Sequence, residues 1–261
     1  MTRRRIRAPH TVPVSSGGIV VLRALRPVRR LRIGQRLSSA GPGFLTLDRF
    51  LAKNVYRDGS VSPWYRFEVL HRRGVDAVAI LPFFLERRTG RVMVICKVGF
   101  RPGLYTRARL RPPIRDRRPR TSIIEAVAGS LEPGDRGQDG ITRRARAELL
   151  EETGLRPISA VLRLGAGFFP SHGQSTEKIH LRAFEVDPAR GETPQGDGSA
   201  NEADSGTLAI EASRLLSMCR RGGIEDPKLE IGVGRLLDRL SGKADSGPGR
   251  TVRPRTGADY K

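Results

Sequence analysis

The sequence contains very few cysteines: Cys96 and Cys219 are the only two among 261 residues, and they lie far apart. That number and spacing exclude a disulfide framework and a cysteine-ligated zinc site. Long apolar runs are also missing, since none approaches the roughly 18 residues that a membrane helix needs. The opening residues lack the apolar stretch of a secretory signal. We therefore expect a soluble, cytoplasmic protein without a membrane partner.

Acidic residues are absent from positions 1–47, which hold ten arginines. This segment, the Arg-rich stretch 101–120 and the tail 241–261 together carry +20 of the net charge of +21. The remaining body is nearly neutral, which disfavours a fold with a built-in nucleic-acid groove. Three roles stay open for 101–120: a rim that attracts anionic substrates, a partner site, or an insertion without a function of its own.

The composition divides the chain into four parts. Residues 1–44 are expected to form a basic, disordered arm, with an organellar transit peptide as the alternative. Residues 45–74 are expected to hold N-terminal strands, and 75–240 the main domain. The polar, Gly- and Pro-containing tail 241–261 is expected to be disordered.

The main domain alternates apolar, β-branched runs with amphipathic segments. The pattern predicts a hairpin and three further strands, at 75–85, 90–100, 121–129, 158–170 and 177–187. Helical spacing appears at 210–222 and 227–240. The order lacks the regular repeat of a Rossmann sheet, so we expect an α/β fold with a mixed sheet and helices on both faces.

A third helix is predicted over 140–153, in GITRRARAELLEET. Ile141, Ala145 and Leu149 form its buried stripe, Asp139 is placed as its N-cap, and Gly154 is a C-terminal stop. The helix ends in a cluster of carboxylates at i, i+3 and i+4, namely Glu148, Glu151 and Glu152. Such closely spaced like charges repel unless a cation lies between them, and hard divalent cations prefer oxygen ligands of this kind.

The stretch from Gly129 to Leu155 resembles the Nudix box, G-x5-E-x7-R-E-U-x-E-E-x-G-U, in which U is aliphatic. Three more segments resemble the ADP-ribose pyrophosphatase and nucleoside-diphosphate-sugar hydrolase subfamily in the same order along the chain. They are the N-terminal strands at 65–82, the arginine-bearing strand end VGFRP at 98–102, and FFPSHGQSTEKIHLRAFEVD at 168–187. The resemblance implies a Nudix-type α/β/α sandwich whose N-terminal strands pair in a homodimer.

Two features depart from the family pattern. The box has four extra residues, so its first acidic position falls on Asp135 when counted from Gly129 and on Asp139 when counted back from Glu148. The family arginine before the helix glutamate is Ala147 here. Arg144, four residues before Glu148, is the best-placed replacement.

The resemblance implies hydrolysis of the pyrophosphate bond of a nucleoside diphosphate derivative, ADP-ribose or a nucleoside-diphosphate sugar, to a nucleoside monophosphate and a sugar phosphate. It implies Mg²⁺ or Mn²⁺ as cofactor. The expected metal ligands are the carboxylates of Glu148, Glu151 and Glu152 and the backbone carbonyl of Ala128, with Asp135 or Asp139 at the first acidic position. The general base is expected in the acidic loop 191–206, with Glu202 as the first candidate and Asp204 as the second.

The expected substrate contacts come from the matching segments. Arginine forks suit phosphate and ribose oxygens, which favours Arg66 and Arg101. By resemblance, Glu125 accepts hydrogen bonds from the nucleoside. The remaining candidates line the terminal ribose and are Ser171, Gly173 and Glu177.

Two alternatives from other classes stay open. The altered box could hold a nucleotide without turnover, which would make the chain a Nudix-fold binding module. An RNA-end pyrophosphohydrolase would use the arginines to bind RNA. The confinement of charge to the flanks and one insertion favours the small-molecule hydrolase over both.

Overall fold

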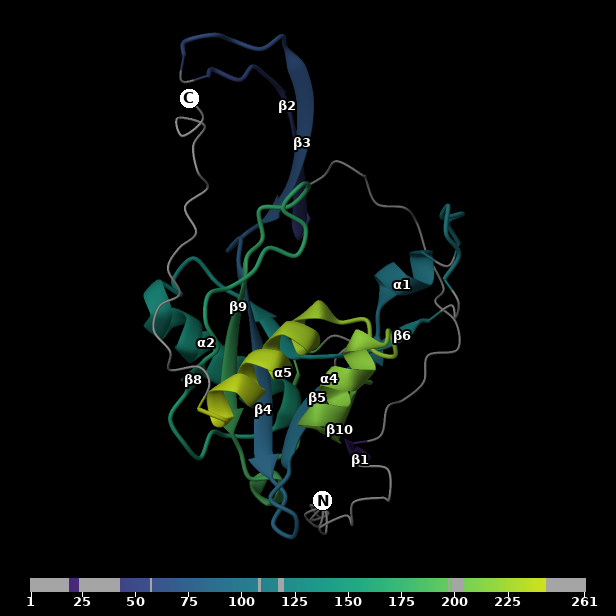
Figure 1. Cartoon of the computed structure of the whole chain (residues 1–261), viewed down its shortest axis with the longest axis vertical. Helices are drawn as coiled ribbons and strands as arrows, with labels where there is room; N and C mark the ends of the chain where they lie inside the picture. Colours follow the sequence, from purple (N-terminus) through teal and green to yellow (C-terminus); the bar gives the residue numbers. More distant parts are fainter. Residues whose placement is uncertain are drawn as a thin grey trace, which may run out of the picture.

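The computed structural model of the chain describes residues 19–23, 43–56, 58–107, 109–116, 120–196, 198 and 204–242. Its centre is an eight-stranded mixed sheet (Figure 1). The strand order is β1 (Ile19–Arg23), β10 (Gly206–Glu211), β5 (Val92–Phe100), β4 (Ala77–Leu85), β9 (Ile179–Glu185) and β8 (Leu162–Arg163); β6 (Ser122–Glu125) pairs with β5, and β7 (Val127–Ser130) pairs with β4. The β4–β9 pair is parallel and all other pairs in this sheet are antiparallel. The predicted α/β class with a mixed sheet is confirmed.

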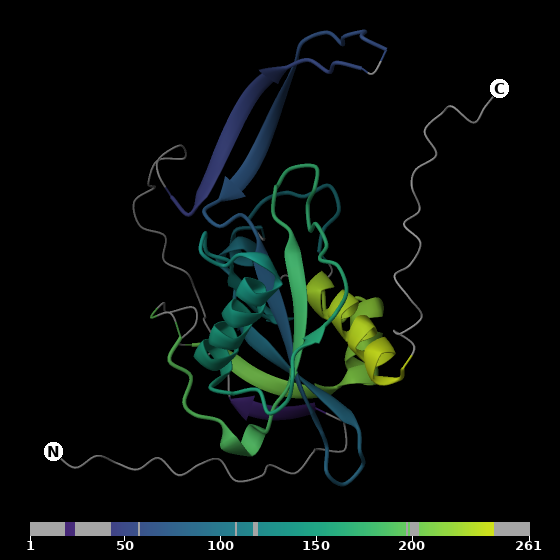
Figure 2. The ribbon, with the colours of Figure 1, turned by 90° about the vertical axis from the view of Figure 1, so that its left-hand side faces the viewer.

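Helices cover both faces of the sheet, as Figure 2 shows. Side chains alternate across a strand, so β4 contributes Val78 and Ile80 to one core and Ala79 and Leu81 to the other. The first core contains residues of α2 (Gly137–Thr153). The second contains residues of α4 (Ala212–Arg220) and α5 (Pro227–Leu240). Helices on two faces explain why β4 is buried along almost its whole length.

A separate two-stranded sheet, which we call the arm, projects from the body (Figures 1 and 2). It consists of β2 (Leu45–Ala52) and β3 (Tyr65–Arg72), as predicted for the N-terminal strands. Arg72 at its base pairs with Glu177 at 2.6 Å and donates to the Asp76 carbonyl at 3.2 Å. These contacts fix the arm to the loop before β9 and to the start of β4.

The helix that carries the carboxylates begins earlier than predicted, at Gly137 rather than Gly140. Its N-cap is Arg136, which makes no side-chain capping hydrogen bond, so the prediction of Asp139 as N-cap is wrong. The predicted stop is confirmed: Gly154 has a φ of 70°, and its N–H donates to the Leu150 carbonyl at 2.8 Å.

Two strand predictions need correction. The predicted strand 121–129 is split into β6 and β7, because the N–H of Ala126 donates to the Asp226 side chain at 2.8 Å. The predicted strand 158–170 contributes only β8 and an isolated bridge from Phe168 to Ile179. Gly165, with a φ of 73°, interrupts it.

Two boundaries also differ from the predictions. The segment 210–222 begins as the end of β10, and helix α4 starts at Ala212. Residues 19–23, which were predicted to belong to the basic, disordered N-terminal segment 1–44, form the edge strand β1. Of the other residues in the segment 1–44, the structure describes only 43–44, and of the tail it describes only 241–242. The predictions for the rest of both segments lie outside the described residues.

The remaining elements are short. Helix α1 (Pro102–Arg107) opens the Arg-rich stretch, and η1 (Pro188–Arg190) follows β9. None of the helices in the described part of the chain has the length and apolarity needed to span a membrane.

Candidate functional site

The C-terminal turns of α2 place the predicted carboxylates against the sheet. The predicted stripe of Ile141, Ala145 and Leu149 is buried, and this burial fixes the rotation of the helix. Glu152, one turn after Glu148, is thereby carried inside, where its side chain is only 4% exposed. Its carboxylate pairs with Lys97 of β5 and accepts from the Ala128 N–H at 3.3 Å. A buried carboxylate requires such partners.

Glu148 lies against the backbone of β7. A Cβ atom at Gly129 would come within 1.9 Å of the Glu148 Cδ atom, so only glycine leaves room for this carboxylate. Arg144 Nη1 lies 4.0 Å from Glu148 Oε1, in the i, i+4 pairing expected of Arg144 as the replacement for the family arginine. The first glycine of the box thus has a packing function.

The two aspartates that compete for the first acidic position have opposite environments. Asp135 is 7% exposed; it accepts from Arg144 Nε at 2.8 Å and from the Glu132 N–H at 3.0 Å. Asp139 is 98% exposed and lies 3.7 Å from Arg163. Burial alone would raise the pKa of Asp135, but the Glu132 N–H and the Arg144 guanidinium outweigh it, and the pKa is lowered. Asp135 therefore anchors the turn, and Asp139 points to solvent.

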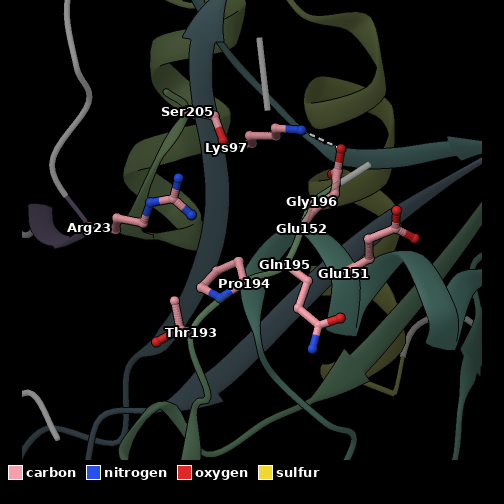
Figure 3. A pocket seen from close by; sticks show the side chains of 9 residues that line it. All are labelled: Arg23, Lys97, Glu151, Glu152, Thr193, Pro194, Gln195, Gly196 and Ser205. Carbon is pink, nitrogen blue, oxygen red and sulfur yellow. Dashed lines mark hydrogen bonds and ion pairs between the residues drawn. The ribbon is translucent and has the colours of Figure 1, made fainter. Parts of the chain in front are cut away.

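A cavity of about 270 Å³ opens beside the end of α2 (Figure 3). It combines residues that are far apart in the sequence: Arg23, Lys97, Glu151, Glu152, Thr193, Pro194, Gln195, Gly196 and Ser205. The loop 193–196 is held to the helix by the Gly196 N–H, which donates to the Glu151 carbonyl at 3.0 Å. The charged side chains among the described residues that line the cavity are two carboxylates and two cationic groups.

The acidic loop predicted to supply a general base therefore does reach the carboxylate helix. Its residues 193–196 form one wall of the cavity, and Ser205 forms part of another. Asp204 immediately precedes Ser205 and is half-buried. Glu202, the first candidate, lies outside the described residues.

Arg101 and Glu125, both predicted to contact substrate, contact each other. Arg101 Nη2 lies 2.6 Å from Glu125 Oε1, and Lys228 Nζ of α5 lies 3.9 Å from Oε2. Glu125 is 8% exposed and opposite Lys97 in the β5–β6 register. Glu125 thus lies on β6, beside Lys97 of β5, and Arg101, which follows β5 and is 49% exposed, is the accessible member of the pair.

The other predicted substrate residues lie at the arm. Arg66 is exposed on β3, opposite Leu51. Glu177 is bound to Arg72. Ser171 and Gly173 belong to the turn whose Gln174 carbonyl accepts from the Leu70 N–H at 2.8 Å. Within one chain, none of these four lines the cavity.

The described residues contain no group of three or more His, Cys, Asp or Glu side chains arranged to hold a metal ion. The contacts of the glutamates give the physical reason. Glu152 is bound by Lys97, Glu148 faces Arg144, and Glu151 borders the cavity. The Ala128 backbone contributes its N–H to Glu152.

Sequence reasoning missed Lys97 and Arg23. Lys97 interrupts the apolar run VMVICKVGF. Because side chains alternate across a strand, it lies on the same side of β5 as the core residues Met93 and Ile95. A lysine that alternation places inside a core requires an anionic partner. That signal was available from the sequence, whereas the position of Arg23 depends on the pairing of β1 with β10.

A scan against protein-family models found no match for the chain, and a search of curated proteins found none. The resemblance to the Nudix box therefore depends on the residues and their arrangement.

Proposed function

We propose that the chain is a divalent-metal-dependent hydrolase of the pyrophosphate bond in nucleoside diphosphate derivatives, with ADP-ribose and nucleoside-diphosphate sugars as the preferred class. In this proposal the three-layer fold is a Nudix-type α/β/α sandwich. The resemblance of 129–155 and of the three flanking segments supports it. The cavity also supports the proposal, because it is lined by both the carboxylate helix and the acidic loop, and the resemblance assigns these two segments to one site.

The charge of the cavity is the observation that carries the proposal. Among the described residues of the lining, the charges of Arg23 and Lys97 balance those of Glu151 and Glu152. A neutral lining gives a doubly negative diphosphate little electrostatic reason to bind. One divalent cation would make the same lining complementary to a diphosphate. Metal and substrate should therefore bind together.

The carboxylates of α2 are the kind of ligand that a hard divalent cation prefers, and Lys97 and Arg144 hold two of them in the metal-free chain. Glu148, Glu151 and Glu152 offer carboxylate oxygens from one helix, and the Lys97 ammonium already places a positive charge on Glu152. When bound, Mg²⁺ or Mn²⁺ would neutralise the diphosphate and lower the pKa of the attacking water.

The chain's own residues then have separate tasks. Arg144 orients Glu148, and Arg101 offers a guanidinium to the substrate beside Glu125. Glu202 or Asp204 accepts a proton from the water while the water oxygen bonds to one phosphorus. The anhydride P–O bond breaks, and its electron pair leaves with the second phosphate, giving a nucleoside monophosphate and a sugar phosphate.

One observation favours a second candidate, a nucleotide-binding module without turnover. Both carboxylate oxygens of Glu152 are engaged, one by Lys97 and the other by the Ala128 N–H. A chain that kept this arrangement would have no Glu152 oxygen available for a metal, so a bound nucleotide would not be hydrolysed.

A panel assay distinguishes the two. ADP-ribose, UDP-glucose, GDP-mannose, NADH and capped RNA are incubated with Mg²⁺ or Mn²⁺, and phosphate is measured after phosphatase coupling. Turnover of ADP-ribose or a sugar nucleotide is expected, with a loss of about 100-fold or more in Glu152→Gln. Glu230→Gln, an exposed carboxylate on α5, is the matched control and should retain activity. If no substrate is turned over while ADP-ribose still raises the melting temperature, the binding module is correct.

We also propose that the chain is a homodimer formed through the arm. The arm and its connecting loop expose many large apolar side chains: Phe44, Leu45, Leu47, Phe50, Leu51, Val55, Tyr56, Val61, Trp64, Tyr65 and Phe67. A two-stranded sheet is marginal alone, and this number of exposed large apolar side chains on one element marks an interface. Pairing would also bring Arg66 close to a second chain.

A further inference from the structure

Lys97 and Glu152 form a buried ion pair in the wall of the cavity (Figure 3). Their side chains are 6% and 4% exposed. Two charges removed from water this far are rarely retained for stability alone, because an apolar pair of similar volume usually serves as well. The position of the pair at the cavity therefore points to a role at the site.

The pair also explains why the glutamates do not form a ready metal site. Glu152 Oε1 is bound by the ammonium, and Oε2 accepts from the Ala128 N–H at 3.3 Å. A divalent cation could use Glu152 only after one of these contacts opens. The backbone N–H is fixed in β7, whereas the ammonium is carried on a flexible four-carbon stem.

We propose that Lys97 is a built-in cation that competes with the divalent metal for Glu152. This inference rests on the proposed function, since it assigns a regulatory step to the same metal site. In the metal-free protein the ammonium neutralises Glu152 and keeps the helix docked. When a divalent cation binds, the Lys97–Glu152 pair opens and the ammonium turns toward the cavity, where Arg23 also lies.

The exchange is electrostatically balanced. The buried carboxylate is never left without a cation, so neither state contains an uncompensated charge at Glu152. The released ammonium faces the space in which the proposed diphosphate would bind. Lys97 therefore lowers the affinity for metal alone and raises it when an anionic substrate is present.

Direct Mn²⁺ binding tests the competition without any turnover. Isothermal titration and Mn²⁺-dependent melting curves are measured for the wild type, Lys97→Met, Glu152→Gln and the double variant. Lys97→Met should melt lower without metal and bind Mn²⁺ about tenfold or more tightly than the wild type, with a correspondingly larger rise in melting temperature. The double variant, which has no buried charge to neutralise, should lose this gain.

Lys97→Gln keeps a hydrogen-bond donor for Glu152 without the charge, and it replaces Lys97→Met if the latter does not fold. Equal or weaker Mn²⁺ binding in the variant than in the wild type would overturn the proposal. Tighter Mn²⁺ binding without turnover of any substrate would uphold the competition and reject the hydrolase. Turnover by the wild type with unchanged Mn²⁺ affinity in the variant would uphold the hydrolase and reject the competition.

Discussion

Asp135 ties the lengthened turn of the box to the helix that follows it. Its carboxylate accepts hydrogen bonds from Arg144 Nε, at 2.8 Å, and from the Glu132 N–H, at 3.0 Å. Arg144 in turn lies 4.0 Å from Glu148. A single arginine thus links the turn to the carboxylate cluster.

Asp135→Asn should destabilise the protein by about 1–3 kcal/mol at pH 7, because it removes a charged acceptor from a nearly buried site. The folded-state pKa of Asp135 lies below its unfolded value. Its contribution is therefore complete above the unfolded value of about 3.9 and is lost as the pH falls through the folded pKa. Urea unfolding at pH 7 and at successively lower pH should show the wild type and the variant converging only in strong acid.

Asp139→Asn is the matched control, since the same charge is removed from a side chain that is 98% exposed. Its stability should stay within about 0.5 kcal/mol of the wild type. A larger loss in Asp139→Asn than in Asp135→Asn would mean that the exposed aspartate is the anchor.

At the scale of elements, β7 and α2 approach so closely that Glu148 occupies the space above Gly129. Gly129→Ala would place a methyl group on the Glu148 carboxylate, which must then move. The moving atoms are the end of a flexible side chain, so the melting temperature should change little. Under the proposed function, hydrolysis should fall by about 100-fold, because a carboxylate proposed to bind the metal is misplaced.

Gly134→Ala is the control for this substitution. A Cβ at Gly134 would meet no atom within 4 Å, and the residue has no positive φ. Both activity and melting temperature should be retained. Full activity in Gly129→Ala would show that the position of Glu148 is unimportant for hydrolysis.

The elements that could be predicted from the sequence are those with a long continuous apolar run, for a strand, or a long apolar stripe, for a helix. Strands β4 and β5 and helices α2 and α5 are of this kind, and each was found within a few residues. The failures have tertiary causes. Ala126 leaves the ladder for Asp226, a hundred residues away, and β10 is a six-residue strand joined directly to α4.

The predictions for the site succeeded and failed for the same reasons as those for the elements. Local spacing predicted the helix carboxylates, the glycine stop and Arg144. It could not predict which oxygen atoms would be free, because the partner of Glu152 is 55 residues away on another element. The usable signal was a charged residue, Lys97, at a position that strand alternation places in the core.

At the scale of the whole molecule, the body and the arm differ in how they bury apolar surface. The body encloses two cores, one on each face of its sheet. The arm exposes Phe50 and Phe67, which are 45% and 40% exposed. Their rings stack on each other with centroids 4.9 Å apart. Among the described residues, the hydrogen bonds that join the arm to the body lie at its base, around Arg72 and Leu70. A chain that builds two complete cores and leaves one sheet uncovered is suited to pairing.

The wild type should therefore sediment with twice the mass of the 28.8 kDa chain. Phe50→Asp and Leu51→Asp, whose side chains alternate across β2, introduce like charges on opposite faces of the arm. Phe50→Asp should give monomers in analytical ultracentrifugation, because two charges would be buried without partners. Leu51→Asp shows whether the opposite face also takes part.

Ile114→Asp is the matched control, because Ile114 is 84% exposed but lies outside the arm. This variant should remain dimeric. A monomeric wild type, or dimers that persist in both arm variants, would rule out the arm as the interface. If Phe50→Asp is monomeric and also loses hydrolysis while its body unfolds normally, residues at the arm, such as Arg66, act on the cavity of the partner chain.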